Sequence, residues 1–160
     1  LSLELEAYIA HFKSLHDQLA EIIRGMPNDE LNWIPIAEQT NSAAVLVTHM
    51  LGAESFRIHQ LAGGVDIDRD RDSEFLVNSS SVTELESFLD NIGTSTEDIL
   101  NRLSSEDLDQ TRPAVRPYEG EETVRWHILH TIEHFGIHIG HLTLTRQLYA
   151  ARYQHTPGGY

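Results

Sequence analysis

The sequence contains no cysteine among its 160 residues. Disulfide bonds, thiolate metal sites and a cysteine nucleophile are therefore excluded. It also lacks any run of about 18 apolar residues, the length that a membrane-spanning helix requires. No charged-then-apolar leader is visible at its beginning, so we expect a cytoplasmic protein.

Basic residues are scarce as well. Lys and Arg number 11 against 25 Asp and Glu, which gives a formal net charge of −14. The negative electrostatic potential of a chain with this net charge repels phosphate backbones and anionic lipids. We therefore expect neither nucleic acid nor a membrane as a partner.

Several catalytic motifs are absent from the chain. The Glu-x-x-His spacing of ferritin-like di-metal sites does not occur, nor does His-Glu-x-x-His. There is no Gly-x-Ser-x-Gly elbow, P-loop or dinucleotide fingerprint. These absences argue against zincin proteases, serine hydrolases of the elbow type and nucleotide-binding enzymes.

Four stretches show the spacing of amphipathic helices. They run from Leu3 to Met26, from Asn41 or Ser42 to Leu61, from Ser81 to Leu103 and from Glu121 to Tyr153. The pattern predicts an all-α protein, a four-helix bundle. We expect one domain over residues 1–153 and a flexible C-terminal tail over 154–160. The two longer connections, after the second and third helices, leave the wiring of the bundle open.

The sequence also predicts the structure of the segments that connect the helices. Ser81 and Glu84 have the spacing of a capping box ahead of the third helix. The segment from Leu31 to Thr40 should be extended, and the alternating charges from Asp66 to Glu74 should be solvated or locally ion-paired. Residues 104–120 should form an irregular crossing, and no strand-like alternation is visible.

Histidines gather on the last predicted helix. Five of the ten lie there, at positions His127, His130, His134, His138 and His141. At about 100° per residue they fall within roughly 80° of arc. Burying several neutral imidazoles without partners would cost about 1–3 kcal/mol each. We therefore expect a metal ion to satisfy them.

The spacing His-x-x-x-His occurs twice there, as His130 with His134 and as His134 with His138. His49 lies on the core face of the second predicted helix. Three imidazoles from two helices would leave coordination positions open, which is typical of catalytic metal sites. Ligation by nitrogen alone suits Zn, Ni, Fe or Cu. Bis-histidine haem ligation is the alternative.

Two segments carry a family resemblance. The last-helix phrase HTIEHFGIHIGHLTLTRQL resembles a signature of the DinB/YfiT-like superfamily, and NSAAVLVTHMLGAE resembles its second-helix signature. LNWIP and RDRDSEF are similar to this group too, so the resemblance covers about residues 25–150. It implies a four-helix bundle, often a homodimer, that holds a divalent metal. Matched by position, the ligands are His49, His134 and His138, with Zn or Ni as the expected ion and Fe as an alternative.

Characterised members of that superfamily include thiol-cofactor transferases and a maleylpyruvate isomerase. The resemblance thus implies an enzyme whose metal, as a Lewis acid, activates a water or a low-molecular-weight thiol. It would be a thiol S-transferase or a hydrolase-like enzyme that acts on a small-molecule substrate. The competing hypothesis is a non-catalytic metal-binding or stress-response module that acts as a dimer. A cavity of roughly 300 Å³ or more above the open metal position would favour the enzyme.

Further residues are candidates for the surroundings of the metal. We expect His130 and His141 to orient ligands or to contact substrate. His16 should either hydrogen-bond in the core or line the cavity. We expect His11, His59 and His155 on the surface, and His127 exposed near the start of its helix. Glu54 and Glu133 could serve as general bases or orient imidazoles, but acids of helices are more commonly found on the surface.

Arg69 and Arg71 could reach an anionic substrate beside the metal. Their neighbours Asp68, Asp70 and Asp72 favour ion pairs within the loop instead.

Overall fold

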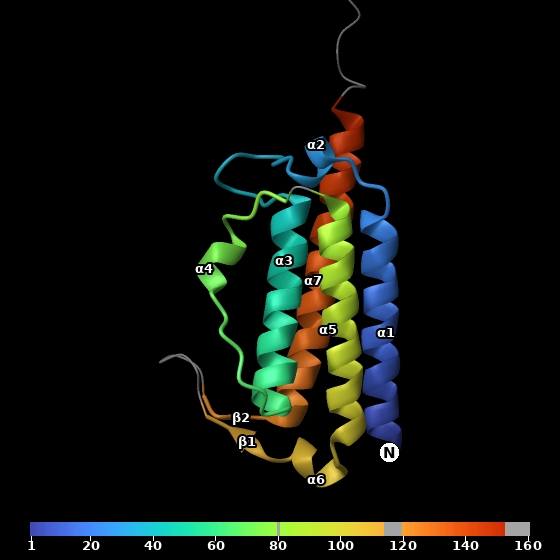
Figure 1. Ribbon diagram of the computed structural model, residues 1–160, viewed down its shortest axis with the longest axis vertical. Coiled ribbons are helices and arrows are strands. Elements are labelled where there is room, and N and C mark those ends of the chain that lie inside the picture. Colours follow the sequence, from blue (N-terminus) through green and yellow to red (C-terminus); the bar gives the residue numbers. More distant parts are fainter. Residues whose placement is uncertain (80, 114–119, 153–160) are drawn as a thin grey trace, which may run out of the picture.

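The chain folds into a bundle of long helices joined by short elements (Figure 1). The computed structural model describes residues 1–79, 81–113 and 120–152. The elements in order are α1 (Leu3–Ile23), α2 (Asn28–Leu31), α3 (Ala43–Glu54), the π-helix η1 (Ser55–Ala62), α4 (Arg71–Glu74), α5 (Val82–Arg102), α6 (Ser105–Leu108), β1 (Thr111–Arg112), β2 (Glu122–Thr123) and α7 (Val124–Ala151). The predicted all-α four-helix bundle is confirmed, whereas the predicted tail, 154–160, lies outside the described residues.

The four long helices are not wired as a simple up-and-down bundle. Figure 1 shows α1 and α7 running in one direction and α3 with η1 and α5 in the other. The segment between η1 and α5 must therefore return along the whole length of the bundle. Within this segment, α4 packs against α3. This return segment places loop residues beside the middle of α3.

Hydroxyl caps fix where three of the long helices begin. The side chains of Ser2, Ser42 and Thr123 accept hydrogen bonds from backbone N–H groups three residues on, at 3.3, 3.2 and 3.1 Å. The capping box predicted for α5 is wrong. Within the described chain the Ser81 side chain makes no cap bond. The residue types have the right spacing, but spacing does not determine the rotamer of the hydroxyl.

The connections are more structured than predicted. The segment expected to be extended begins at the end of α2, and the charged loop contains α4, whose Glu74 is only 6% exposed. The irregular crossing contains α6 and β1, and β1 pairs with β2 antiparallel, with Thr111 opposite Thr123. Strands of two residues are too short to produce an alternating pattern.

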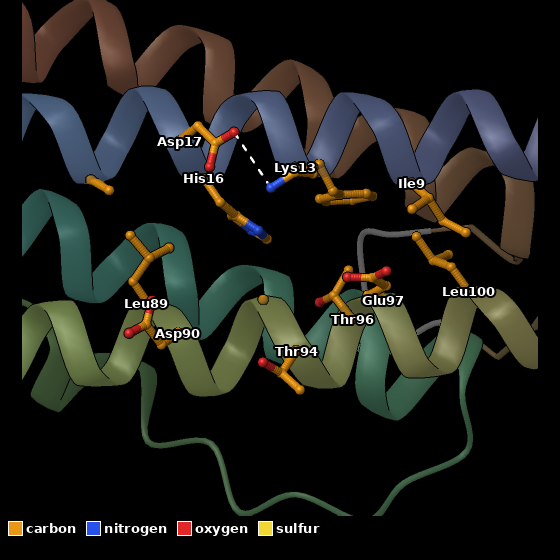
Figure 2. Close-up of a pocket in the computed structure, with 13 residues that line it drawn as sticks. Ile9, Lys13, His16, Asp17, Leu89, Asp90, Thr94, Thr96, Glu97 and Leu100 are labelled. Atoms are coloured by element: carbon orange, nitrogen blue, oxygen red, sulfur yellow. Dashed lines mark ion pairs between the residues drawn. The ribbon is translucent and has the colours of Figure 1, made fainter.

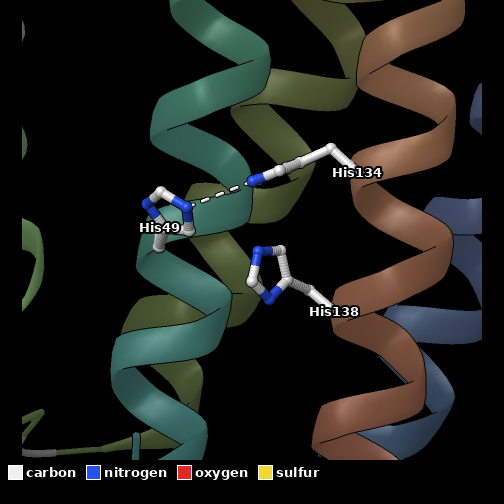
Figure 3. A group of neighbouring side chains, drawn as sticks. All are labelled: His49, His134 and His138. Carbon is white, nitrogen blue, oxygen red and sulfur yellow. Dashed lines mark hydrogen bonds between the residues drawn. The ribbon is translucent and has the colours of Figure 1, made fainter.

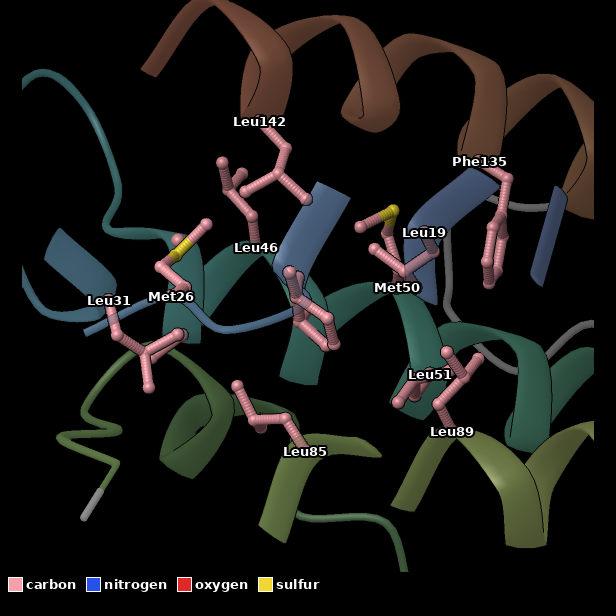
Figure 4. Close-up of a cluster of buried hydrophobic side chains, with 14 of the residues drawn as sticks. Leu19, Met26, Leu31, Leu46, Met50, Leu51, Leu85, Leu89, Phe135 and Leu142 are labelled. Atoms are coloured by element: carbon pink, nitrogen blue, oxygen red, sulfur yellow. The ribbon is translucent and has the colours of Figure 1, made fainter. Parts of the chain in front are cut away.

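The apolar core lies where the four long helices meet (Figure 4). Leu46 and Met50 of α3 pack in one cluster with Leu89 of α5 and with Phe135 and Leu142 of α7. Full burial of such a side chain stabilises the fold by about 1.5–3 kcal/mol. Because α3 is packed against α5, α7 and α4, most of its residues are buried. A histidine on α3 is therefore enclosed by the packing of its neighbours.

A second buried group of side chains is polar. His16 Nε2 lies 2.9 Å from Glu54 Oε2, and the Thr96 hydroxyl donates to Glu54 Oε1 at 2.6 Å. His59 Nε2 lies 3.0 Å from that hydroxyl. Burial lowers the pKa of His59, and the charge of Glu54 opposes that effect. The surface position predicted for His59 is wrong, because His59 meets Thr96 of α5. Glu54 is buried and binds the imidazole of His16, so the alternative expectation for Glu54 holds.

The π-helix η1 continues α3 without a break, so the predicted second helix is confirmed. Wider π turns occur frequently at functional sites. Here η1 directs His59 to the buried polar group and Arg57 toward α7. In the described part of the chain, no helix combines the length and apolar character needed to cross a membrane. The cytoplasmic location stays a prediction.

Candidate metal centre

Three histidines from two helices converge between α3 and α7 (Figure 3). His49 comes from α3, and His134 and His138 lie one turn apart on α7. One ring nitrogen from each lies within 4.8 Å of the others, and His49 Nε2 is 3.1 Å from His134 Nε2. Among the described residues no fourth histidine or carboxylate joins this group. The structure thus brings together the three residues predicted as ligands.

The protonation of these rings suits a metal, because only a neutral imidazole offers a lone pair. Burial, followed by the charges of His138 and His49, lowers the pKa of His134 to about 3. Burial and the charge of His49 likewise lower the pKa of His138 to about 4. Both rings are therefore neutral at physiological pH.

The spacing of the rings also suits a shared ion. Two nitrogens that bind one tetrahedral zinc, each at about 2.0–2.1 Å, are separated by about 3.3 Å. The observed 3.1 Å between His49 Nε2 and His134 Nε2 is close to that value. The three residues would accordingly hold a divalent ion by nitrogen alone.

A buried carboxylate fixes the orientation of His49. Its Nδ1 lies 2.9 Å from Glu74 Oε2, so the N–H on that side donates to the carboxylate and the lone pair of Nε2 faces His134. Arg69 donates to both oxygens of the same carboxylate, at 2.6 and 2.9 Å. Burial raises the pKa of Glu74, but the bonds from His49 and Arg69 outweigh it and hold this pKa below its usual value. The carboxylate is therefore charged.

Gly52 makes room for this carboxylate. A Cβ at position 52 would lie 2.3 Å from Glu74 Oε1, well inside any real contact distance. Any side chain there would push Glu74 away from His49. A glycine in the middle of a helix destabilises the helix by about 1 kcal/mol relative to alanine. The close approach of Glu74 explains why this position is nevertheless a glycine.

The local ion pair predicted for the charged loop is confirmed for Arg69, but its partner differs from the expected one. Arg69 binds Glu74, the buried last acid of the loop, and not a neighbouring aspartate. The guanidinium of Arg71 lies over the ring of Phe75, 4.9 Å from its centre. Sequence analysis missed Glu74 because it is the last acid of a charged run that looked solvated.

A cavity of about 140 Å³ adjoins the histidines. It is lined by His49, Ala53, Arg57, Arg69, Arg71, His130 and His134. The cavity is smaller than the roughly 300 Å³ expected of an enzyme site and fits one small group. Arg57 was not predicted here, although it follows His49 and Ala53 at intervals of four residues.

The other predicted residues divide between this site and the rest of the molecule. His130 lines the cavity and stacks on Trp126, with ring centres 4.7 Å apart. His141 Nδ1 lies 3.4 Å from His138 Nδ1 at the exposed side. His127 was expected to be exposed but is 5% exposed, and its Nδ1 is 3.1 Å from Arg57 Nη1.

His16 is not among the residues that line the cavity beside the histidine triad. It binds Glu54 and lines a different cavity, of about 190 Å³, between α1 and α5 (Figure 2). The expected core hydrogen bond of His16 is confirmed. The alternative, that His16 lines the cavity of the metal site, is not met.

Comparison with known proteins gives a family and a fold. A family model described as mycothiol-S-transferase matches residues 7–151. No match was found among curated protein sequences.

Three solved structures share the fold. A conserved protein of Enterococcus faecalis has a TM-score of 0.74 at 15% identity, covering 95% of this chain and 99% of its own. A DinB-like protein of Bacillus subtilis has a TM-score of 0.68 at 22% identity, with 96% of each chain covered. A DinB-like protein of Bacillus cereus has a TM-score of 0.71 at 14% identity, with 97% of each covered.

Displacing Glu74 should weaken metal binding without removing a ligand. We expect Gly52→Ala and Glu74→Ala each to raise the Kd for Zn²⁺ by about 10- to 100-fold, because His49 loses its orientation. Competition with a fluorescent chelator measures this Kd. Asp72→Ala, a change to an exposed acid of the same short helix, is the control and should leave it unchanged. Unchanged Kd values in both test variants would show that the carboxylate does not support the site.

Proposed function

Because the chain belongs to the mycothiol-S-transferase family, we propose that it is a metal-dependent thiol S-transferase. The family match and the two DinB-like structures confirm the resemblance to the DinB/YfiT-like superfamily. The observation that carries the proposal is the histidine triad, whose three rings converge beside a cavity lined by further polar groups.

In this proposal His49, His134 and His138 are the metal ligands. Zn or Ni is the expected ion and Fe an alternative, because the donor set is nitrogen alone. When bound, a divalent ion lowers the pKa of a low-molecular-weight thiol and so supplies a thiolate nucleophile near neutral pH. The chain has no cysteine, so the thiol must come from a co-substrate.

The protein's own residues have distinct tasks in the transfer. Glu74 and Arg69 hold His49, and His130, in the wall of the cavity, contacts the small-molecule substrate. His141 neighbours His138 at the exposed side and orients it. In the reaction the thiol sulfur forms a bond to an electrophilic carbon of the substrate. The bond from that carbon to its leaving group breaks, and the thiol proton passes to solvent.

Calorimetric titration of zinc-loaded protein with thiols tests this function. We expect saturable heat with at least one of mycothiol, bacillithiol and glutathione. His49→Ala and His134→Ala should each lose stoichiometric metal by elemental analysis, and the heat with it, because two imidazoles hold an ion poorly. His11→Ala, which changes an exposed histidine of α1, should retain both.

Two results would oppose the proposal at different points. Full metal content in both ligand variants would refute the ligand assignment. Stoichiometric metal in the wild type, with no heat from any of the three thiols, would leave the ligands in place and favour a metal-binding module without transferase activity.

A homodimer through α7 is the second part of the proposal. Trp126, Leu129, Ile137, Leu144 and Leu148 form an exposed apolar stripe along this helix, each 37–53% exposed. Gly136 and Gly140 lie along the same side, and a Cβ at either would meet nothing within 4 Å. Each of these glycines destabilises the helix by about 1 kcal/mol relative to alanine. Packing within the described chain does not explain why glycine is found at these two positions. Close approach of a second α7 would explain both glycines.

Sedimentation velocity tests the dimer. We expect a species of twice the 18.1 kDa chain mass, and Leu144→Glu should shift it to the monomer because a charge enters the apolar stripe. Ser87→Glu adds the same charge to an exposed residue of α5, away from this face of α7, and should leave the dimer intact. A wild type that sediments as 18.1 kDa over the accessible concentration range would contradict the dimer.

A further inference from the structure

The cavity between α1 and α5 takes no part in the proposed function. Its volume is about 190 Å³, larger than that of the cavity beside the histidine triad. His16 projects from α1 into the space between the two helices, with Asp90 to one side and Thr96 to the other (Figure 2). Apolar side chains form the rest of the wall around the imidazole: Ile9, Phe12, Ala20, Leu89 and Leu100. The cavity thus combines an apolar wall with a mostly buried imidazole.

A fully buried carboxylate fixes the orientation of this imidazole. The two oxygens of Glu54 lie 3.0 and 2.9 Å from His16 Nε2, so the N–H of that nitrogen donates to the carboxylate. The hydroxyl of Thr96 donates to Glu54 as well, at 2.6 Å. Because Nε2 carries the proton, the lone pair of a neutral His16 lies on Nδ1. Within the described chain no group donates a hydrogen bond to Nδ1, which leaves an acceptor at the wall of the cavity.

Gly93 of α5 lies directly against this acceptor. A Cβ at position 93 would lie 2.9 Å from His16 Nδ1 and 3.3 Å from its Cε1. An alanine in the middle of α5 would stabilise the helix by about 1 kcal/mol relative to glycine. It would also cover Nδ1 or displace the ring that Glu54 holds. The glycine therefore keeps the acceptor of His16 open to the cavity.

The charged residues around Gly93 are mainly acidic. Asp90 and Glu97 lie about one turn before and one turn after Gly93 on the same face of α5, and both line the cavity. Neither carboxylate forms an ion pair within the part of the chain that the structure describes. Lys13, the basic residue among the described lining residues, is 3.7 Å from Asp17, so its charge is balanced. The potential at the cavity consequently attracts a cation and repels an anion.

We propose that this cavity is a second ligand site, which binds a short aliphatic primary amine in its ammonium form. One N–H of the ammonium group donates to His16 Nδ1, and the other two face Asp90 and Glu97. The alkyl chain lies along the apolar wall. A hydroxyl has one donor and no charge, and a carboxylate has no donor, so neither matches this set of acceptors as well. The site does not include the histidine triad, and it does not depend on the proposed function.

Titration with n-butylammonium chloride, followed by the ¹⁵N NMR signals of the histidine rings, tests this site. We expect a saturable shift of the His16 Nδ1 signal, because this nitrogen accepts a hydrogen bond from the ligand. Binding of n-butanol should be about tenfold weaker, because a charged donor makes the stronger hydrogen bond. Butyrate should not bind. Tetrabutylammonium should not bind either, because it carries the charge without an N–H donor.

Two variants with matched controls separate the acceptor from the surrounding charge. Gly93→Ala should weaken n-butylammonium binding by at least about tenfold, because its Cβ occupies the space beside Nδ1. Ser95→Ala changes an exposed residue of the same helix outside the cavity and should have no effect. The double variant Asp90→Asn with Glu97→Gln should weaken binding by about 3- to 10-fold. Asp98→Asn removes an exposed acid of α5 that does not line the cavity, and it should bind as the wild type does.

The proposal is overturned if the His16 signal shows no saturable shift, or if n-butanol, butyrate or tetrabutylammonium binds as tightly as n-butylammonium. It is also overturned if a folded Gly93→Ala variant binds n-butylammonium as the wild type does. Circular dichroism checks the folding of that variant. If it does not fold, the double variant decides, and unchanged affinity there overturns the proposal.

His134→Ala separates this site from the metal centre. The variant should lose the metal and still bind n-butylammonium with unchanged affinity. Loss of amine binding in this variant would contradict a ligand site that is separate from the histidine triad.

Discussion

The meeting of two imidazole nitrogens across the α3–α7 interface is the contact on which the rest of this structure depends. His49 Nε2 and His134 Nε2 lie 3.1 Å apart, and His138 adds a third ring from the next turn of α7. This packing brings nitrogens of His49, His134 and His138 together in one small space, and the Nδ1 of His134 is buried without a hydrogen-bond partner in the described chain. A cation shared by their lone pairs satisfies all of them, and the lowered pKa values of His134 and His138 keep those lone pairs available.

The wiring of the bundle supports that contact. Since α3 and α5 run in the same direction, the connection between them must run back along α3 (Figure 1). This return brings Glu74, Arg69 and Arg71 beside the histidine triad. A simple up-and-down connection would be short and would leave His49 without its carboxylate. The same segment therefore orients His49 through Glu74 and lines the cavity beside the histidines through Arg71.

Local periodicity predicted the helices and placed His49 and the histidines of the last helix on inward faces. It offered His130 with His134 as readily as His134 with His138, and the family resemblance selected the second pair. Neither predicted the partners that come from distant segments. Glu54 and His59 looked like surface residues of their own helices, and only packing against α1 and α5 shows that His16 and Thr96 bind them. Glu74 was one acid among several in a run of charges, and Arg57 was not singled out although it lies two turns after His49 on the same face of its helix.

X-ray absorption at the zinc edge of zinc-loaded protein tests the central claim most directly. The account predicts three imidazole nitrogens at about 2.0–2.1 Å, together with a light or sulfur ligand from solvent or added thiol in the remaining position. A spectrum with fewer than three imidazoles, or with every position filled by protein side chains, would contradict it.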